Sequence, residues 1–238
     1  MYAISYTFFL FMSYNENKGV IMKEIDVKNW NRQNTYKWFK SFSNSTYGCN
    51  VKMDVTKLVE FVKKNNHSFF IDTLYLVVMG LDSVEEMRMR LVDDKPVIFD
   101  KLNPAFTVMT ESGTFENLRY DFDKNYKSFY ETSQQKIQAL KSQNKVGRNN
   151  YNPENCYNEY YITCTPWLNF ESLTHPIPDN QASQCVPRIC WGKYIKQDEK
   201  YYLTLNITVS HIFVDGYPLA QVFNNIQELF NNVENVLI

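Results

Sequence analysis

Residues 200–216, KYYLTLNITVSHIFVDG, decide the fold of this 238-residue chain. Apolar and polar side chains alternate over residues 203–209, which is the period-two pattern of a strand with one buried face. His211 continues the apolar set, and Asp215 and Gly216 then break the strand. We therefore expect a strand that ends at an inward-pointing imidazole and leads into a loop. Such positions often carry chemistry, because the sheet holds the side chain rigidly while the loop opens to a cleft.

The rest of the chain predicts a mixture of helices and strands. Asp54 is a candidate N-cap of an amphipathic helix, and residues 219–233 have the apolar spacing of another. The remaining expectations are a mostly buried helix over 71–91, strands at 96–99 and 105–109, a second amphipathic helix over 123–143, and a loop over 144–156.

Composition excludes several classes of protein. The 25 basic residues balance 26 acidic ones without a long basic run, so we expect no nucleic-acid partner. An aromatic share of 16% favours pockets lined by rings. The five cysteines are odd in number and contain no CxxC pair, which favours a reduced cytoplasmic protein without a metal site. They are Cys49, Cys156, Cys164, Cys185 and Cys190.

No repeat or Pro/Gly/Ser-rich linker divides the sequence, so we expect one domain over residues 24–238 behind an N-terminal extension over 1–23. The apolar start of that extension lacks a basic n-region and a cleavage site, and it is too short to cross a bilayer. We therefore expect neither a signal peptide nor a membrane anchor. Translation could begin at Met1 or at Met22.

A lone histidine on an apolar face is more often a hydrogen-bonded core residue than a catalyst. The spacing His-x-x-x-Asp-Gly at a strand end, however, resembles the active-site motif of chloramphenicol acetyltransferases. Dihydrolipoamide acyltransferases and condensation domains share that motif, but their upstream modules or double length do not fit this chain. The resemblance continues in order through residues 26–32, 86–89, 103–108, 113–115, 165–170, 192–194 and 211–216.

The resemblance implies an α/β two-layer sandwich in which a mainly antiparallel sheet packs on helices. It also implies a homotrimer that transfers an acetyl group from acetyl-CoA to a hydroxyl of chloramphenicol or a related alcohol. In such a trimer, the base of one subunit faces an acceptor pocket built largely by its neighbour.

The catalytic roles that the resemblance implies fall on four residues. His211 would be the general base, with its ring held partly by its own backbone carbonyl. Asp215 and Arg32 would form a structural ion pair instead of a proton relay. Thr163 stands where the family has the serine that donates to the oxyanion, and its hydroxyl can do the same.

The resemblance also places the contacts to both substrates. Phe39 and Phe115 keep the aromatic character of the acceptor pocket. Four further pocket positions depart from the family, because polar or smaller groups replace the usual ones: Leu173, His175, Arg188 and Cys190. Arg188 would have to turn outward, pair with an acid or bind a polar acceptor. The implied contacts to the coenzyme are Trp167, Lys193 and Tyr194.

Two other functions remain open at this point. The departures at Arg188 and Cys190 would suit a weakly active or non-catalytic protein that binds a more polar ligand. A Cys-His hydrolase that uses Cys190 with His211 is the other alternative, although no thiol-protease signature accompanies the pair.

Overall fold

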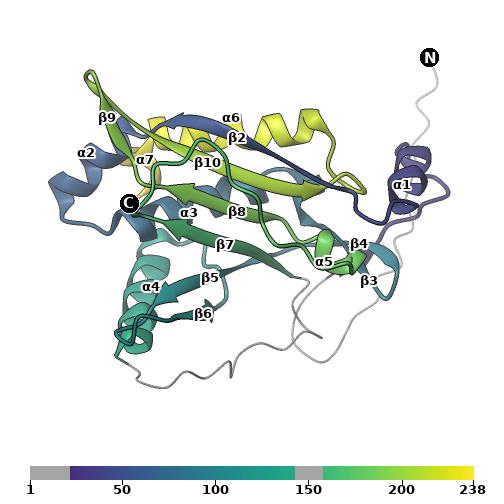
Figure 1. The fold of residues 1–238 in the computed structure, drawn as a ribbon, viewed down its shortest axis with the longest axis horizontal. Coiled ribbons are helices and arrows are strands. Elements are labelled where there is room, and N and C mark those ends of the chain that lie inside the picture. Colours follow the sequence, from purple (N-terminus) through teal and green to yellow (C-terminus); the bar gives the residue numbers. More distant parts are fainter. Residues whose placement is uncertain (1–21, 143–157) are drawn as a thin grey trace, which may run out of the picture.

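The computed structural model describes residues 22–142 and 158–238, and the predicted loop over 144–156 lies outside them. Within the described residues, seven strands form the central sheet (Figure 1) in the order β2-β10-β8-β7-β5-β6, with β9 paired to β10. Their bounds are β2 Thr46–Asp54, β5 Asn103–Met109, β6 Phe115–Arg119, β7 Glu159–Thr165, β8 Arg188–Gly192, β9 Ile195–Gln197 and β10 Lys200–Ser210.

The prediction of a mainly antiparallel sheet is wrong, because the sheet is mixed. β7 runs parallel to both β5 and β8, whereas β10 runs antiparallel to β2, β8 and β9, and β5 antiparallel to β6. Parallel neighbours require a long crossover connection. Between β5 and β7 the chain contains β6 and α4, and between β7 and β8 it contains residues 166–187. Strand periodicity reports which face is buried but not the direction of a neighbour, so it did not reveal this.

Helices cover one face of the sheet. They are α2 Thr56–Asn65, α3 Phe69–Asp82, α4 Tyr126–Lys141 and α6 Gly216–Asn231, which is followed by the short α7 Val233–Val236. α3 is buried on almost all sides, as its apolar sequence predicts. The predicted helix over 71–91 nevertheless ends early. After Asp82 the chain forms a 3-10 turn, Glu85–Arg88, and then β3, Met89–Val92.

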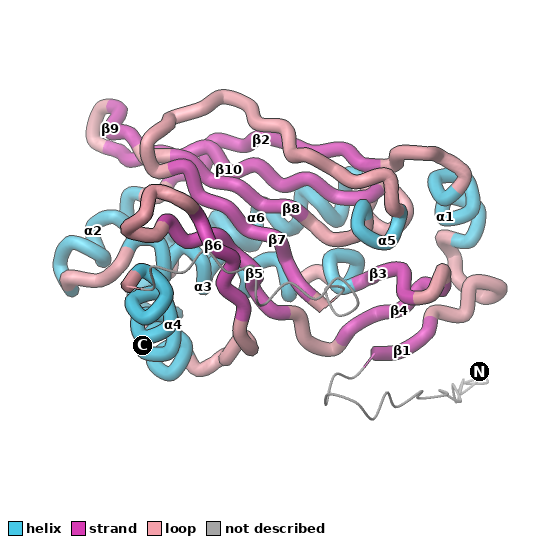
Figure 2. The backbone as a smooth tube through the Cα atoms, turned by 60° about the horizontal axis from the view of Figure 1, so that its bottom comes forward, coloured by secondary structure: helices cyan, strands magenta, loops and turns pink. Residues whose placement is uncertain are grey.

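A small sheet and two short helices complete the described part of the fold (Figure 2). β1 Met22–Glu24, β4 Lys95–Phe99 and β3 form the small sheet in the order β1-β4-β3. α1 Gln33–Lys40 and α5 Gln181–Gln184 lie toward the same end of the molecule. The first two residues of β1, Met22 and Lys23, fall within the N-terminal extension predicted over 1–23. In the described ranges, no helix is long and apolar enough to cross a membrane.

Candidate active site

His211 lies immediately after β10 and is held from three sides. Its backbone N–H donates to the carbonyl of Ser45 at 2.8 Å. Its ring stacks on Phe39 of α1 with centroids 3.9 Å apart and planes 9° apart, and the Tyr47 ring lies 4.7 Å away. The side chain is 30% exposed, so it sits at the edge of the core and not fully inward as expected. The imidazole is therefore fixed in position but open to a substrate.

Arg32 clamps the loop that follows His211. Its Nε donates to Asp215 Oδ2 at 2.9 Å and its Nη2 to Oδ1 at 2.5 Å. The same guanidinium donates to the carbonyls of Ile212 at 2.8 Å and His211 at 3.2 Å. Partial burial acts to raise the pKa of Asp215, but the hydrogen bonds and charge of Arg32 together outweigh it and lower that pKa. The ion pair that the resemblance implied is present, and it fixes both ends of the loop.

The Nδ1 atom of His211 faces the same carboxylate. It lies 3.0 Å from Asp215 Oδ1, yet it makes no hydrogen bond within the described residues. The contact is therefore one of proximity and charge. Both carboxylate oxygens of Asp215 already accept hydrogen bonds from Arg32. This arrangement differs from a Ser-His-Asp triad, in which the carboxylate is free to hold the imidazole.

A row of polar side chains crosses the sheet on the face opposite the helices. Asn50 of β2 is in register with Asn206 of β10, Asn206 with Cys190 of β8, and Cys190 with Thr163 of β7. Thr163 in turn hydrogen-bonds Thr107 of β5 through their hydroxyls at 2.9 Å. We call these five residues the polar row. The predicted oxyanion donor thus belongs to a continuous line of hydrogen-bonding groups.

Within one chain, the polar row is distant from the imidazole. Asn206 precedes His211 by five residues along β10, which is about 15 Å, and Thr163 lies two strands further across, which is about 10 Å. A reacting carbonyl must be within about 3 Å of both the base and the oxyanion donor. One copy of this chain therefore cannot bring the two predicted catalytic groups to one reaction centre.

The burial of Cys190 argues against the Cys-His hydrolase alternative. Cys190 is fully buried in the middle of β8, at the level of Asn206 and not of His211. Burial raises the pKa of the Cys190 thiol to about 11. The thiol therefore stays protonated at neutral pH and is a poor nucleophile.

Four of the predicted acceptor contacts lie on the face of the sheet that carries the polar row: Cys190, which belongs to the row, and Leu173, His175 and Arg188. Leu173 and His175 lie in the segment that connects β7 to β8, and His175 Nε2 is 3.0 Å from Asn206 Oδ1. Arg188 is buried, donating to the carbonyls of Ser183 at 3.0 Å and Val186 at 3.1 Å. These carbonyls give the guanidinium of Arg188 a structural role. The sequence alone predicts instead that it turns outward, pairs with an acid or binds a polar acceptor.

The predicted coenzyme contacts cluster at the carboxyl ends of β7 and β8. Trp167 is 65% exposed, Lys193 is exposed, and Tyr194 packs on Phe69 with centroids 4.8 Å apart. Gly192 keeps this corner tight, since an added Cβ would lie 2.6 Å from the carbonyl oxygen of Leu168. Phe115, predicted for the acceptor pocket, is separate from them on β6 and is 62% exposed.

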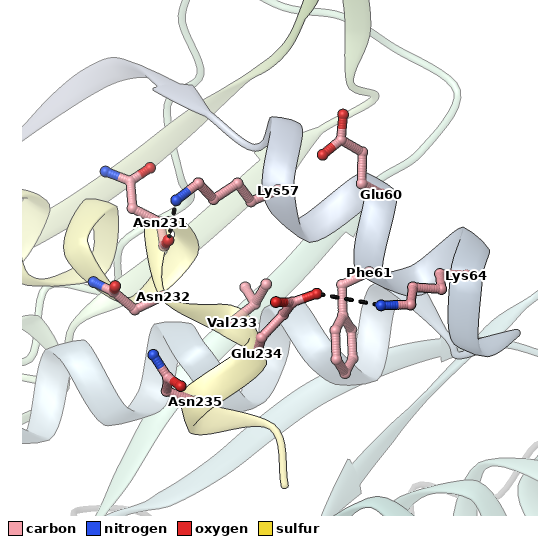
Figure 3. Close-up of a pocket in the computed structure, with 9 residues that line it drawn as sticks. All are labelled: Lys57, Glu60, Phe61, Lys64, Asn231, Asn232, Val233, Glu234 and Asn235. Atoms are coloured by element: carbon pink, nitrogen blue, oxygen red, sulfur yellow. Dashed lines mark hydrogen bonds and ion pairs between the residues drawn. The ribbon is translucent and has the colours of Figure 1, made fainter.

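A polar pocket of about 390 Å³ lies elsewhere, between α2 and the C-terminal segment (Figure 3). Its cations already have partners: Lys57 donates to the Asn231 carbonyl at 2.9 Å, and Lys64 lies 3.5 Å from Glu234. It contains none of the predicted site residues. Among residues 22–142 and 158–238, no three acidic, His or Cys side chains group in a way that could hold a metal ion.

Sequence reasoning missed Tyr47, Ser45 and Asn206, all of which support the site. Tyr47 packs against the imidazole and donates from its hydroxyl to the Val214 carbonyl at 3.2 Å. Tyr47 belongs to β2 and Ser45 immediately precedes it, and no strand was predicted at those positions. The alternation of Val51 and Met53 with polar residues is the signal that could have revealed β2.

Comparison with known proteins gives the family. The family profile described as "Chloramphenicol acetyltransferase" matches residues 20–227. The chain belongs to the chloramphenicol acetyltransferase family. Chloramphenicol acetyltransferase 3 of Escherichia coli is 28% identical over 210 residues, covering 88% of this chain and 97% of the relative. The chloramphenicol acetyltransferase of Clostridium perfringens is 28% identical over 220 residues, covering 90% and 96%.

Solved structures agree on the fold. A chloramphenicol acetyltransferase structure superposes with a TM-score of 0.81 at 22% identity, covering 88% of this chain and 99% of the other. A probable dihydrolipoamide acetyltransferase of Listeria monocytogenes follows with a TM-score of 0.59 at 13% identity, covering 89% and 95%. The family assignment confirms the predicted resemblance and makes the chain an acetyltransferase.

Proposed function

We propose that this protein transfers an acetyl group from acetyl-CoA to a hydroxyl of chloramphenicol or a related small alcohol, with His211 as the general base. The observation that carries the proposal is the way in which the imidazole is held. Phe39 and the Ser45 carbonyl fix the residue, and Nδ1 is buried against Asp215. Nε2 is neither buried nor hydrogen-bonded to any described residue, so it is the nitrogen available to an alcohol.

The proposed reaction is a proton transfer coupled to acyl transfer. Nε2 takes the proton of the alcohol as its oxygen attacks the thioester carbonyl, and the carbonyl oxygen becomes an oxyanion. The Thr163 hydroxyl donates a hydrogen bond to that oxyanion. When the tetrahedral intermediate collapses, the C–S bond breaks and the imidazolium returns its proton to the departing CoA sulfur. The products are the acetyl ester and free CoA thiol.

We propose that the site is completed by a second copy of the chain in a homotrimer. The distance between Thr163 and His211 within one chain supports this assembly. Mixing His211→Ala and Thr163→Val subunits by unfolding and refolding tests it. If each site takes its base from one subunit and its donor from the next, about a quarter of the sites in a random mixture regain both groups. Activity that stays at the sum of the two separate variants would count against a shared site.

The corner formed by Trp167, Lys193 and Tyr194 suits the coenzyme. An exposed indole offers a flat surface to an extended chain, and Lys193 offers a charge to phosphate groups. Acetyl-CoA supplies the acyl group as a thioester. We place the enzyme in the cytoplasm, where the coenzyme is available. The four cysteines in the described ranges are unpaired, which is typical of a reducing compartment.

Acetylation assays that follow thiol release test the function directly. His211→Ala should lower kcat for chloramphenicol by several orders of magnitude, because it removes the nitrogen that takes the proton in the proposed step. Tyr217→Ala is the matched control, since Tyr217 is exposed and follows the same loop. Affinity for chloramphenicol or acetyl-CoA without turnover in the unmodified protein would favour the alternative of a binding protein. Activity would also predict resistance of the host cell to chloramphenicol.

A further inference from the structure

His175 forms a hydrogen-bonded pair with the centre of the polar row. Its Nε2 atom lies 3.0 Å from Oδ1 of Asn206, which is 1% exposed in the middle of β10. The roles of the two atoms depend on which way the Asn206 amide points and on which ring nitrogen carries the proton. The surrounding backbone fixes both.

The orientation of the Asn206 amide follows from Leu173. The backbone N–H of Leu173 donates to Asn50 Oδ1 at 3.3 Å, so this oxygen is an acceptor. The Asn206 atom that lies 2.9 Å from the same oxygen must therefore be the donor, Nδ2. Nδ2 also donates to the Leu173 carbonyl at 3.3 Å. A flipped amide would place its oxygen against two acceptors, so Oδ1 faces His175.

The proton on His175 follows in turn. Because Oδ1 can only accept, Nε2 must carry the hydrogen, and Nδ1 of the neutral ring is left with a lone pair. Burial, assisted by the charge of Arg188, lowers the pKa of His175 although the Asn206 bond acts to raise it, so the ring is neutral at pH 7. Nδ1 is neither buried nor hydrogen-bonded to a described residue.

We propose that Nδ1 of His175 is a specificity-determining hydrogen-bond acceptor, which selects alcohol substrates that carry a second hydroxyl or an amide N–H. This inference rests on the proposed function. Asn206 lies two strands from Thr163, about 10 Å by strand spacing, and His175 is bonded to it. A small alcohol that reacts near Thr163 can therefore place a second polar group on His175. Asn206 is the residue that positions the ring.

A pair of alcohols that differ by one hydroxyl tests the selection. 1-Phenylpropane-1,3-diol has the second donor, and 3-phenylpropan-1-ol lacks it. The unmodified enzyme should have a KM for the diol lower by about 2- to 12-fold, the value of one neutral hydrogen bond. In His175→Leu the preference should disappear through a higher KM for the diol, and in His175→Gln the amide oxygen should restore part of it. Thr204→Val, on the same face of β10, is the control and should keep the preference.

A second measurement reads the proton itself. The ¹⁵N NMR shifts of His175 in the intact protein should report the tautomer with the proton on Nε2, and Asn206→Leu should allow a mixture of tautomers. A proton on Nδ1, or equal discrimination between the two alcohols by the unmodified protein and His175→Leu, would overturn the inference. If neither these alcohols nor chloramphenicol is acetylated, the proposed function fails. In that case the tautomer of His175 and the calorimetric affinities of the protein for the two alcohols still test the role of His175.

Discussion

Replacing Arg32 by Ala should destabilise the loop that carries His211. The guanidinium makes two hydrogen bonds to Asp215 and one each to the carbonyls of His211 and Ile212, and Ala retains none of them. Breaking a fully buried ion pair costs about 3–5 kcal/mol. Arg32 is 14% exposed but Asp215 is 38% exposed, so water compensates part of the loss and we expect about 2–3 kcal/mol.

Thermal unfolding with parallel kinetics measures this effect. In a domain of this size, each kcal/mol lowers Tm by about 2–4 °C, so Arg32→Ala should melt about 4–12 °C lower. In Arg32→Ala, kcat should fall by a larger factor than KM rises. The His211 ring would still stack on Phe39, but the His211 carbonyl would lose its hydrogen bond from Arg32. Arg32→Lys keeps the charge without the planar fork and should be intermediate. A variant that melts within 1 °C of the parent and keeps kcat would refute the clamp.

The pH dependence of the same variant has a definite sign. The pKa of Asp215 is lowered in the folded protein, so the folded state binds fewer protons there than the unfolded state does. The pair contributes its full stability above the unfolded pKa of about 3.9 and loses it as pH falls through the lower folded value. The difference in stability between parent and Arg32→Ala should therefore be constant near neutrality and shrink in acid. A difference that grew in acid would contradict the assignment.

Two further predictions concern packing and reactivity. Gly192→Ala should raise KM for acetyl-CoA several-fold with little change in KM for the alcohol, because the new Cβ would push the Leu168 carbonyl and the adjoining Trp167 outward. Steady-state kinetics with each substrate varied in turn measure both constants. An unchanged KM for acetyl-CoA would count against that corner as the coenzyme site. Iodoacetamide at pH 7.5 should label exposed Cys49 and leave buried Cys190 unmodified in the folded protein. The reason is that a thiol with a pKa of about 11 is almost entirely protonated at this pH. Rapid labelling of Cys190 in peptide maps would contradict its burial.

The sequence predicts best those elements whose periodicity alone determines them. The alternation over 203–209 placed the strand before His211 correctly, and the buried helix α3 was recognisable from its apolar run. The prediction extended that helix to Leu91, but residues 89–91 pair with β4 as part of β3. Periodicity cannot settle such a boundary, since pairing partners are distant in the sequence.

The candidate site shows the same limit. Spacing alone identified His211 and Asp215, which are four residues apart on one loop. The stack on Phe39 depends on how α1 docks against the end of β10, and the sequence contains no local signal for it. The polar row depends on the register of five strands, so Asn206 was interpreted only as the polar half of an alternating pattern. The resemblance to a family supplied roles for residues whose proximity no local pattern could show.

The register of the sheet also separates the polar row from the residues that hold His211. Phe39 of α1, Tyr47 of β2, and Ser45, Arg32 and Asp215 in the adjoining loops contact His211. The family departures Thr163 and Cys190 lie in the polar row, about 15 Å along the strands from it. A substitution in the row alters what the alcohol meets without loosening the clamp by Arg32. Acceptor preference can therefore drift while the base remains intact. On this geometry, His175→Leu should change which alcohol is chosen, and His211→Ala should change whether any alcohol reacts.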